Sequence, residues 1–97
     1  MKLTGTQRKA LRGMAHGIKP LIHVGRRGLT DELLEELSRT LDSHELVKIR
    51  FSDFKDDKKE LCAVIEERLS AENVGIIGHN AIFYRQQEDP EKRKIVV

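Results

Sequence analysis

The sequence has few residues that could crosslink the chain or anchor it to a membrane. It contains one cysteine, Cys62, which cannot form an internal disulfide and is typical of a reducing compartment. No stretch approaches the roughly 18 consecutive apolar residues of a membrane span. The first residues also lack an apolar segment of signal-peptide length. We therefore expect a cytoplasmic protein that has no membrane partner.

Aromatic and metal-binding residues are equally sparse. Four aromatic residues and no tryptophan are too few for an aromatic RNA-binding platform. The four histidines include no pair at the i, i+4 spacing of a helical zinc site, and the single cysteine adds no ligand pair. A chain of 97 residues can bury one core without metal or disulfide support. We predict one folded unit without a metal or other cofactor.

Motifs for enzymatic chemistry are absent as well. The sequence lacks the full Gly-X-Gly-X-X-Gly fingerprint, a P-loop Gly-Lys-Ser/Thr and a nucleophile elbow. Paired carboxylates such as Glu35-Glu36 and Glu66-Glu67 fall on expected helical solvent faces. We expect no catalytic residues and no small-molecule substrate, so a small enzyme acting on a phosphate ligand ranks last among the hypotheses.

Charge is distributed very unevenly along the chain. The formal net charge is only +2, yet residues 1–30 hold seven basic residues and no acidic one. Residues 31–74 hold 13 acidic and seven basic residues. Such asymmetry indicates a surface for a polyanion, although a basic stretch can also be an ordinary solvated face.

Hydrophobic periodicity predicts seven elements in the order α-β-α-β-α-β-β. Thr4 and Gln7 fit a capping box for the first helix, and Thr30 fits an N-cap for the second. The expected segments are helices over 5–16, 31–43 and a third starting near 57–60, and strands over 20–24, 46–51, 74–77 and 81–84. The order favours a two-layer α/β sandwich with a four-stranded mixed sheet, whose final hairpin adds an antiparallel edge. The polar tail after Gln86 is expected to be flexible.

The segment Gly25-Arg26-Arg27-Gly28 interrupts the first strand just before the second helix. Glycines allow close approach to a ligand, the helix start offers amide donors, and two guanidinium groups suit phosphate oxygens. A Gly-X-X-Gly loop with basic middle residues resembles the loop with which KH modules clamp a nucleic-acid backbone. The same four residues can also form an ordinary turn, but the acid-free stretch before them favours phosphate binding.

Two further positions leave alternatives open. Lys48 and Arg50 share the polar side of their strand, where they either extend a basic surface or pair with helix carboxylates. Phe83 and Tyr84 alternate on the last strand, so one should pack inward while the other could be exposed for base stacking. Because aromatic residues are few, we expect contacts mainly to the nucleic-acid backbone.

Several segments of this sequence together resemble the CRM domain (chloroplast RNA splicing and ribosome maturation), in its stand-alone bacterial, YhbY-like form. The resemblance runs from about Leu3 to Arg85 and keeps the order and spacing of the motifs. The matching segments are Leu11-x-x-x-Ala15-His16-x-x-Lys19-Pro20, Val24-Gly25-x-x-Gly28-Leu29-Thr30, His44-Glu45-Leu46-Val47-Lys48-Ile49 and Phe83-Tyr84-Arg85.

The resemblance implies a fold similar to the C-terminal domain of translation initiation factor three, with a single RNA-binding domain over 1–86 and a tail over 87–97. It implies that the Gly-X-X-Gly loop contacts RNA, with the basic residues of the first helix as its flank. It also implies a pre-ribosomal particle and precursor large-subunit ribosomal RNA as partners. His16 and the His44-Glu45 pair would brace helix ends near the loop. The predicted RNA-binding residues are Gly25, Arg26, Arg27, Gly28, Arg8, Lys9, Arg12, Lys19, Lys48 and Arg50.

A second hypothesis belongs to another functional class. The acidic helices over 31–43 and 58–70 could dock a basic ribosomal protein, which would make the chain a protein-interaction module.

Overall fold

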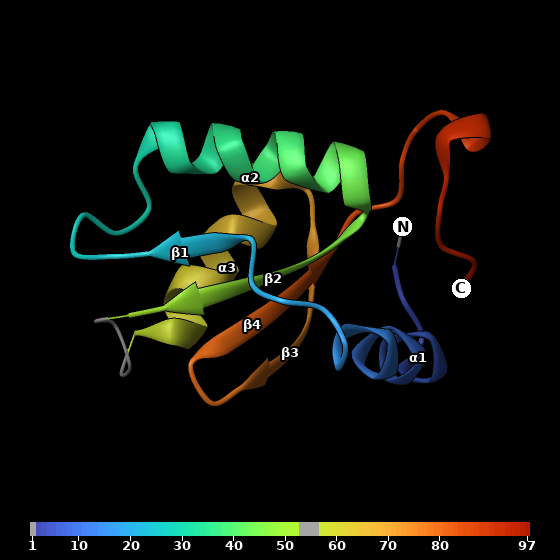
Figure 1. The fold of residues 1–97 in the computed structure, drawn as a ribbon, viewed down its shortest axis with the longest axis horizontal. Helices are drawn as coiled ribbons and strands as arrows, with labels where there is room; N and C mark the ends of the chain where they lie inside the picture. Colours follow the sequence, from blue (N-terminus) through green and yellow to red (C-terminus); the bar gives the residue numbers. More distant parts are fainter. Residues whose placement is uncertain (1, 53–56) are drawn as a thin grey trace.

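A computed structural model describes residues 2–52 and 57–97 of the chain. Its elements follow the predicted order, with a short 3₁₀ turn added near the C-terminus (Figure 1). The elements are α1 (Gly5–Ala15), β1 (Ile22–Val24), α2 (Asp31–His44), β2 (Leu46–Phe51), α3 (Lys58–Leu69), β3 (Glu72–Ile77), β4 (Asn80–Tyr84) and η1 (Pro90–Lys92). Within these described ranges, the helices are too short or too polar to cross a membrane.

The strands form one mixed sheet in the order β1-β2-β4-β3. β1 runs parallel to β2, whereas β4 pairs antiparallel with both β2 and β3. The final hairpin therefore places β3, and not β4, at the sheet edge. This arrangement confirms the predicted mixed α/β class with four strands.

The larger core lies between the sheet and the pair α2 and α3. Leu34, Leu37 and Leu41 of α2 form the buried stripe of that helix, as the leucine spacing predicts. They pack with Val47, Ile49 and Phe51, among other residues. Alternate side chains of β2 thus point toward α2 and α3, because successive strand residues face opposite sides of a sheet.

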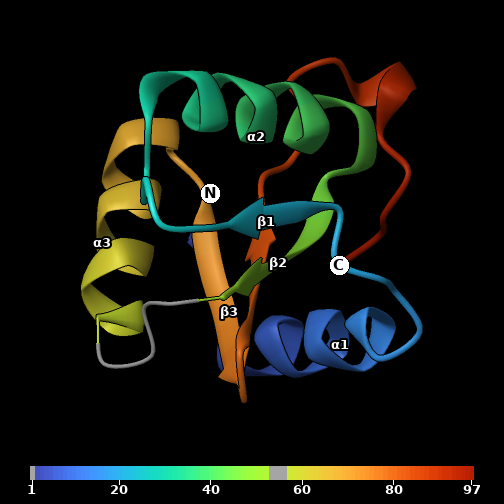
Figure 2. The same cartoon turned by 60° about the vertical axis from the view of Figure 1, so that its left-hand side comes forward.

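A smaller second core adds a layer that the predicted two-layer sandwich does not include. Leu11 and Ala15 of α1 pack on Leu46, Ile82 and Tyr84, which alternate with the residues of the larger core. Helix α1 consequently lies on the opposite face of the sheet from α2, as Figures 1 and 2 show. The sequence predicted the apolar stripe of α1 but held no signal for which face it covers.

The predicted helix starts are both present. Thr4 and Gln7 form the reciprocal capping box, and the Thr30 hydroxyl accepts the Leu33 N–H at 3.1 Å. Such caps satisfy amide groups that a helix leaves without partners.

The tail over 87–97, which the sequence predicts to be flexible, is docked on the domain in this structure. The carboxylate of Glu45 is buried and accepts the backbone N–H groups of Gln87 (2.8 Å), Lys94 (2.6 Å) and Ile95 (3.0 Å). Ile95 and Val97 also pack against the second core. A single acidic side chain thereby joins the start of β2 to the C-terminal segment, a contact that local sequence cannot reveal.

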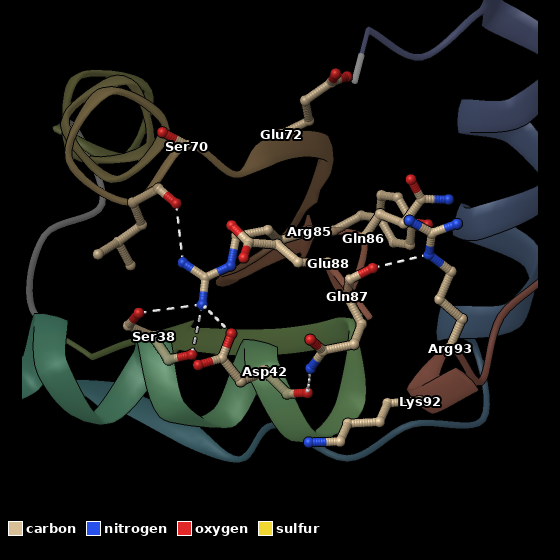
Figure 3. Close-up of a pocket in the computed structure, with 12 residues that line it drawn as sticks. Ser38, Asp42, Ser70, Glu72, Arg85, Gln86, Gln87, Glu88, Lys92 and Arg93 are labelled. Carbon is tan, nitrogen blue, oxygen red and sulfur yellow. Dashed lines mark hydrogen bonds and ion pairs between the residues drawn. The ribbon is translucent and has the colours of Figure 1, made fainter. Parts of the chain in front are cut away.

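Arg85, at the end of β4, also connects separate elements of the fold through its side chain (Figure 3). Its guanidinium donates to the carbonyls of Leu69 (2.9 Å) and Ser38 (2.7 Å) and pairs with Asp42 at 2.9 Å. It therefore holds the end of β4 to both α2 and α3. Although it lines a pocket, the Arg85 guanidinium is already occupied by these bonds.

The Glu45 contacts predict a pH-dependent loss of stability. Burial alone would raise the Glu45 pKa, but the N–H donors of Gln87, Lys94 and Ile95 outweigh it and lower the pKa below its ordinary value of 4.5. Replacing Glu45→Gln should lower the free energy of unfolding at pH 7 by about 2 kcal/mol, because hydrogen bonds to a charged acceptor are lost. Urea unfolding of both proteins measures the difference.

A carboxyl group whose pKa is lower in the folded state than in the unfolded state stabilises the protein at pH values above its unfolded-state pKa. This stabilisation disappears as the pH falls through the folded-state pKa. The gap between wild type and Glu45→Gln should therefore shrink once the pH drops below 4.5. A gap that stays constant from pH 7 to pH 3 would contradict the role assigned to the ionised carboxylate.

Candidate nucleic-acid interface

The segment Gly25–Gly28 forms a tight turn between β1 and α2. The Gly28 N–H donates to the Gly25 carbonyl at 3.0 Å, and Gly28 has a φ of +67°. Neither arginine has a positive φ, which fits a type I turn with glycine in the last position. The two middle residues, Arg26 and Arg27, are exposed. The turn thus presents two consecutive arginines to solvent just after the end of β1.

The start of α2 contributes less to anion binding than the sequence suggested. The Thr30 hydroxyl already accepts one of the first helical N–H groups, and Asp31 and Glu32 place carboxylates on the first turn. These negative charges offset the positive end of the helix dipole. A shallow depression does lie between the turn and the first residues of α2, and Glu32 and Glu36 are part of its lining. The arginine side chains, and not the helix end, therefore provide the positive charge here.

Lys48 and Arg50 lie on the sheet face that carries α1. They alternate with Val47, Ile49 and Phe51, whose side chains enter the core on the opposite face. Among the described residues, no ion pair involves Lys48 or Arg50. Arg50 is exposed and Lys48 half-buried, so both extend the basic surface.

His23 joins this surface, although it is not among the residues selected from the sequence. The parallel register sets His23 beside Arg50, and the strand pattern leaves His23 exposed between the buried Ile22 and Val24. The exposed histidine in an otherwise buried strand was a visible signal. Its neighbour Arg50 could not be identified from the sequence, because that requires the pairing register of β1 with β2.

The basic residues predicted on α1 separate into two groups. Arg8 pairs with Glu72 at 3.0 Å and donates to the Asn73 carbonyl, while Arg12 donates to the Val74 carbonyl at 2.9 Å. The stem of Arg12 lies so close over Gly75 that an added Cβ there would be 2.9 Å from its Cδ. These two arginines therefore hold α1 to the edge strand β3. Because these contacts use N–H donors of both guanidinium groups, fewer donors remain for a ligand.

Lys9 and Lys19 are exposed, but they do not border the turn directly. Figure 1 shows the 25–30 connection at one end of the molecule and α1 toward the other. The turn follows the end of β1, whereas α1 precedes its start. The residues that adjoin the turn are thus those of β1 and β2, and not the basic residues of α1 that the resemblance implied as the flank of the loop.

Other sequence-based expectations also change. Phe83 and Tyr84 are both buried, because the two alternating side chains enter the two different cores, so neither is available for base stacking.

Glu45 is structural as expected, but it lies beyond the last turn of α2, away from the loop at the first turn. His16 caps the end of α1, where its N–H donates to the Gly13 carbonyl.

The fold and this surface define a small mixed α/β domain that presents a basic turn at the end of a sheet strand. The family model of the CRS1 / YhbY (CRM) domain matches residues 3–85, and the chain belongs to this family. The match ends just before the tail that Glu45 holds in place.

Comparisons with individual proteins agree with this membership. A Pseudomonas aeruginosa protein named as a probable RNA-binding protein is 34% identical over 93 residues, covering 95% of this chain and 89% of that protein. A Haemophilus influenzae protein named RNA-binding protein is 34% identical over 89 residues, with 90% and 89% covered. The solution structure of a hypothetical Staphylococcus aureus protein, described as a candidate RNA-binding protein, has a TM-score of 0.80 at 32% identity and covers 98% of this chain and 100% of that one.

The two glycines of the turn should respond differently to substitution. Gly28→Ala should lower the free energy of unfolding by about 1–2 kcal/mol, because a residue with a Cβ is strained at this positive φ. Gly25→Ala should leave stability within about 0.5 kcal/mol, since an added Cβ meets nothing within 4 Å and the φ is not positive. Chemical unfolding of the two variants makes the comparison, and equal losses would refute the assigned turn geometry.

Proposed function

We propose that this protein binds RNA through the basic turn and the adjoining exposed face of β1 and β2. Family membership and the names of the relatives support RNA as the ligand. The observation that carries the proposal is the pair Arg26 and Arg27, exposed at the tip of a turn and continued by Arg50 on the sheet. Planar guanidinium groups bind phosphate oxygens with two parallel hydrogen bonds, which suits an RNA backbone.

The distribution of charge supports a single RNA-facing side. Helix α1, strand β1 and the turn contain no acidic residue, whereas α2 carries five carboxylates and one arginine. The carboxylate-bearing α2 lies on the opposite side of the sheet from α1. An RNA molecule approaching this protein would be attracted to one face and repelled by the other, which fixes the orientation of binding.

The finer identity of the RNA is an extension of this proposal. We infer that the ligand is precursor ribosomal RNA of the large subunit, bound in the cytoplasm within a pre-ribosomal particle. The protein would then act as an assembly factor that holds RNA and catalyses no reaction. Crosslinking in cells, followed by sequencing of the attached RNA, tests this step, and enrichment of messenger or bulk RNA alone would exclude it.

Removing both turn arginines provides the direct test of RNA binding. In Arg26→Ala/Arg27→Ala the affinity for RNA should fall, and the slope of log K against log salt should decrease by about 1–2 because up to two phosphate contacts are lost. Fluorescence anisotropy at several salt concentrations measures both quantities. Because both side chains are exposed, the fold should be unaffected.

The matched control is Arg39→Ala/Lys59→Ala, which removes the same charge from exposed positions on α2 and α3. The control should retain nearly the wild-type affinity and salt slope. If the turn variant and the control behave alike, net charge accounts for the binding and the turn is not the site.

A second candidate is docking of a basic protein by the acidic face. Glu35 and Glu36 are exposed on α2, and the ion pairs of the described residues do not include them. Charge reversal at both positions should abolish association with the pre-ribosomal particle while binding to free RNA persists. Unchanged particle association would exclude this candidate.

A further inference from the structure

Three polar side chains form a row across the end of the sheet beside the turn. The register sets His23 of β1 next to Arg50 of β2, and Arg50 next to Asn80 of β4. All three lie on the α1 face, because their neighbours along each strand are buried in the core of the opposite face. His23 and Arg50 are exposed. We call these three residues the strand-end row.

Phosphate binding does not explain this composition. Asn80 is neutral, and a histidine is a weaker cation than lysine or arginine at neutral pH. The row instead brings two planar groups together, the imidazole of His23 and the guanidinium of Arg50. Adjacent strands lie about 4.8 Å apart, so these planes can contact one ligand at the same time.

Unpaired RNA bases stack on histidine rings and arginine guanidinium planes as well as on larger aromatic rings. The aromatic side chains of Phe51, Phe83 and Tyr84 are buried and unavailable for such stacking. Among the described residues of β1, β2 and β4, His23 and Arg50 are therefore the exposed side chains with a ring or a guanidinium plane. The Oδ1 of Asn80 is buried without a hydrogen-bond partner, so the contacts of this row with a base are assigned to His23 and Arg50.

The position of the row relative to the turn also suits a nucleotide. His23 precedes Gly25 by two residues, which corresponds to about 7 Å of extended chain. A phosphate held by Arg26 and Arg27 would leave its base within reach of the row. Base faces in an RNA duplex are covered by neighbouring bases, and the narrow major groove does not admit side chains. Occupation of the row by a base therefore requires an unpaired nucleotide.

We propose that the strand-end row stacks an unpaired base of the RNA whose backbone is held by the turn. The protein then prefers single-stranded segments to duplexes, and His23 and Arg50 determine this preference. The inference rests on the proposed RNA binding, shares Arg50 with it, and concerns a different class of contact.

The test separates stacking from charge. Arg50→Lys keeps the positive charge but removes the planar group, and His23→Ala removes the ring. The ligands are a short single-stranded RNA containing one 2-aminopurine, the same strand with an abasic residue at that position, and the same strand annealed to its complement. Affinity, salt slope and 2-aminopurine fluorescence are measured for each.

Wild type should bind the single strand more tightly than the duplex and should change the 2-aminopurine fluorescence on binding. Arg50→Lys should weaken single-strand binding by about fivefold to a hundredfold, the range expected for one stacked base, without changing the salt slope. His23→Ala should weaken it in the same direction. Both effects should disappear with the abasic strand.

Arg39→Lys, an exposed substitution of the same kind on α2, is the matched control and should bind as wild type. Wild-type affinity in both Arg50→Lys and His23→Ala, or equal losses on duplex and single strand, would overturn the stacking role. If these variants bind normally while Arg26→Ala/Arg27→Ala is impaired, only this inference fails. If the turn variant also binds RNA as wild type does, the proposed function itself fails.

Discussion

The arrangement of this domain depends on the alternation of side chains along β2. Val47, Ile49 and Phe51 enter the large core under α2 and α3, which forces Lys48 and Arg50 onto the opposite face. Slipping the register by one residue would expose three apolar side chains and bury two charged ones, at a cost of several kcal/mol. The register of β2 is thereby fixed, and with it the position of the exposed basic face beside the turn.

The structure distinguishes arginines that the sequence presents as equivalent. Arg8, Arg12 and Arg85 donate to backbone carbonyls of neighbouring elements and connect parts of the fold. Arg26 and Arg27 extend from a turn, and Arg50 from an exposed strand position. Charge counting therefore locates the basic half of the molecule correctly but overstates how many of its arginines are available to an RNA ligand.

Local patterns were sufficient to predict much of this structure. The capping box at Thr4, the leucine stripe of α2 and the alternation of β2 each depend on residues close in sequence. The face covered by α1, the clamp that Glu45 places on the tail and the neighbours of His23 depend on long-range register. The contacts of α1 with β3 join residues up to 65 positions apart and those of Glu45 with the tail up to 50, and local periodicity carries no information about such distances. The candidate turn was accordingly predictable, while the sheet surface beside it required the fold.

Chemical-shift mapping of backbone amides during titration with single-stranded RNA locates the RNA-binding surface residue by residue. If RNA binds at the turn and the adjoining strands, the largest changes should occur at residues 23–28 and 48–50, with α2 beyond its first turn unaffected. Changes concentrated on the exposed side of α2, or confined to α1 with residues 25–28 unchanged, would contradict it.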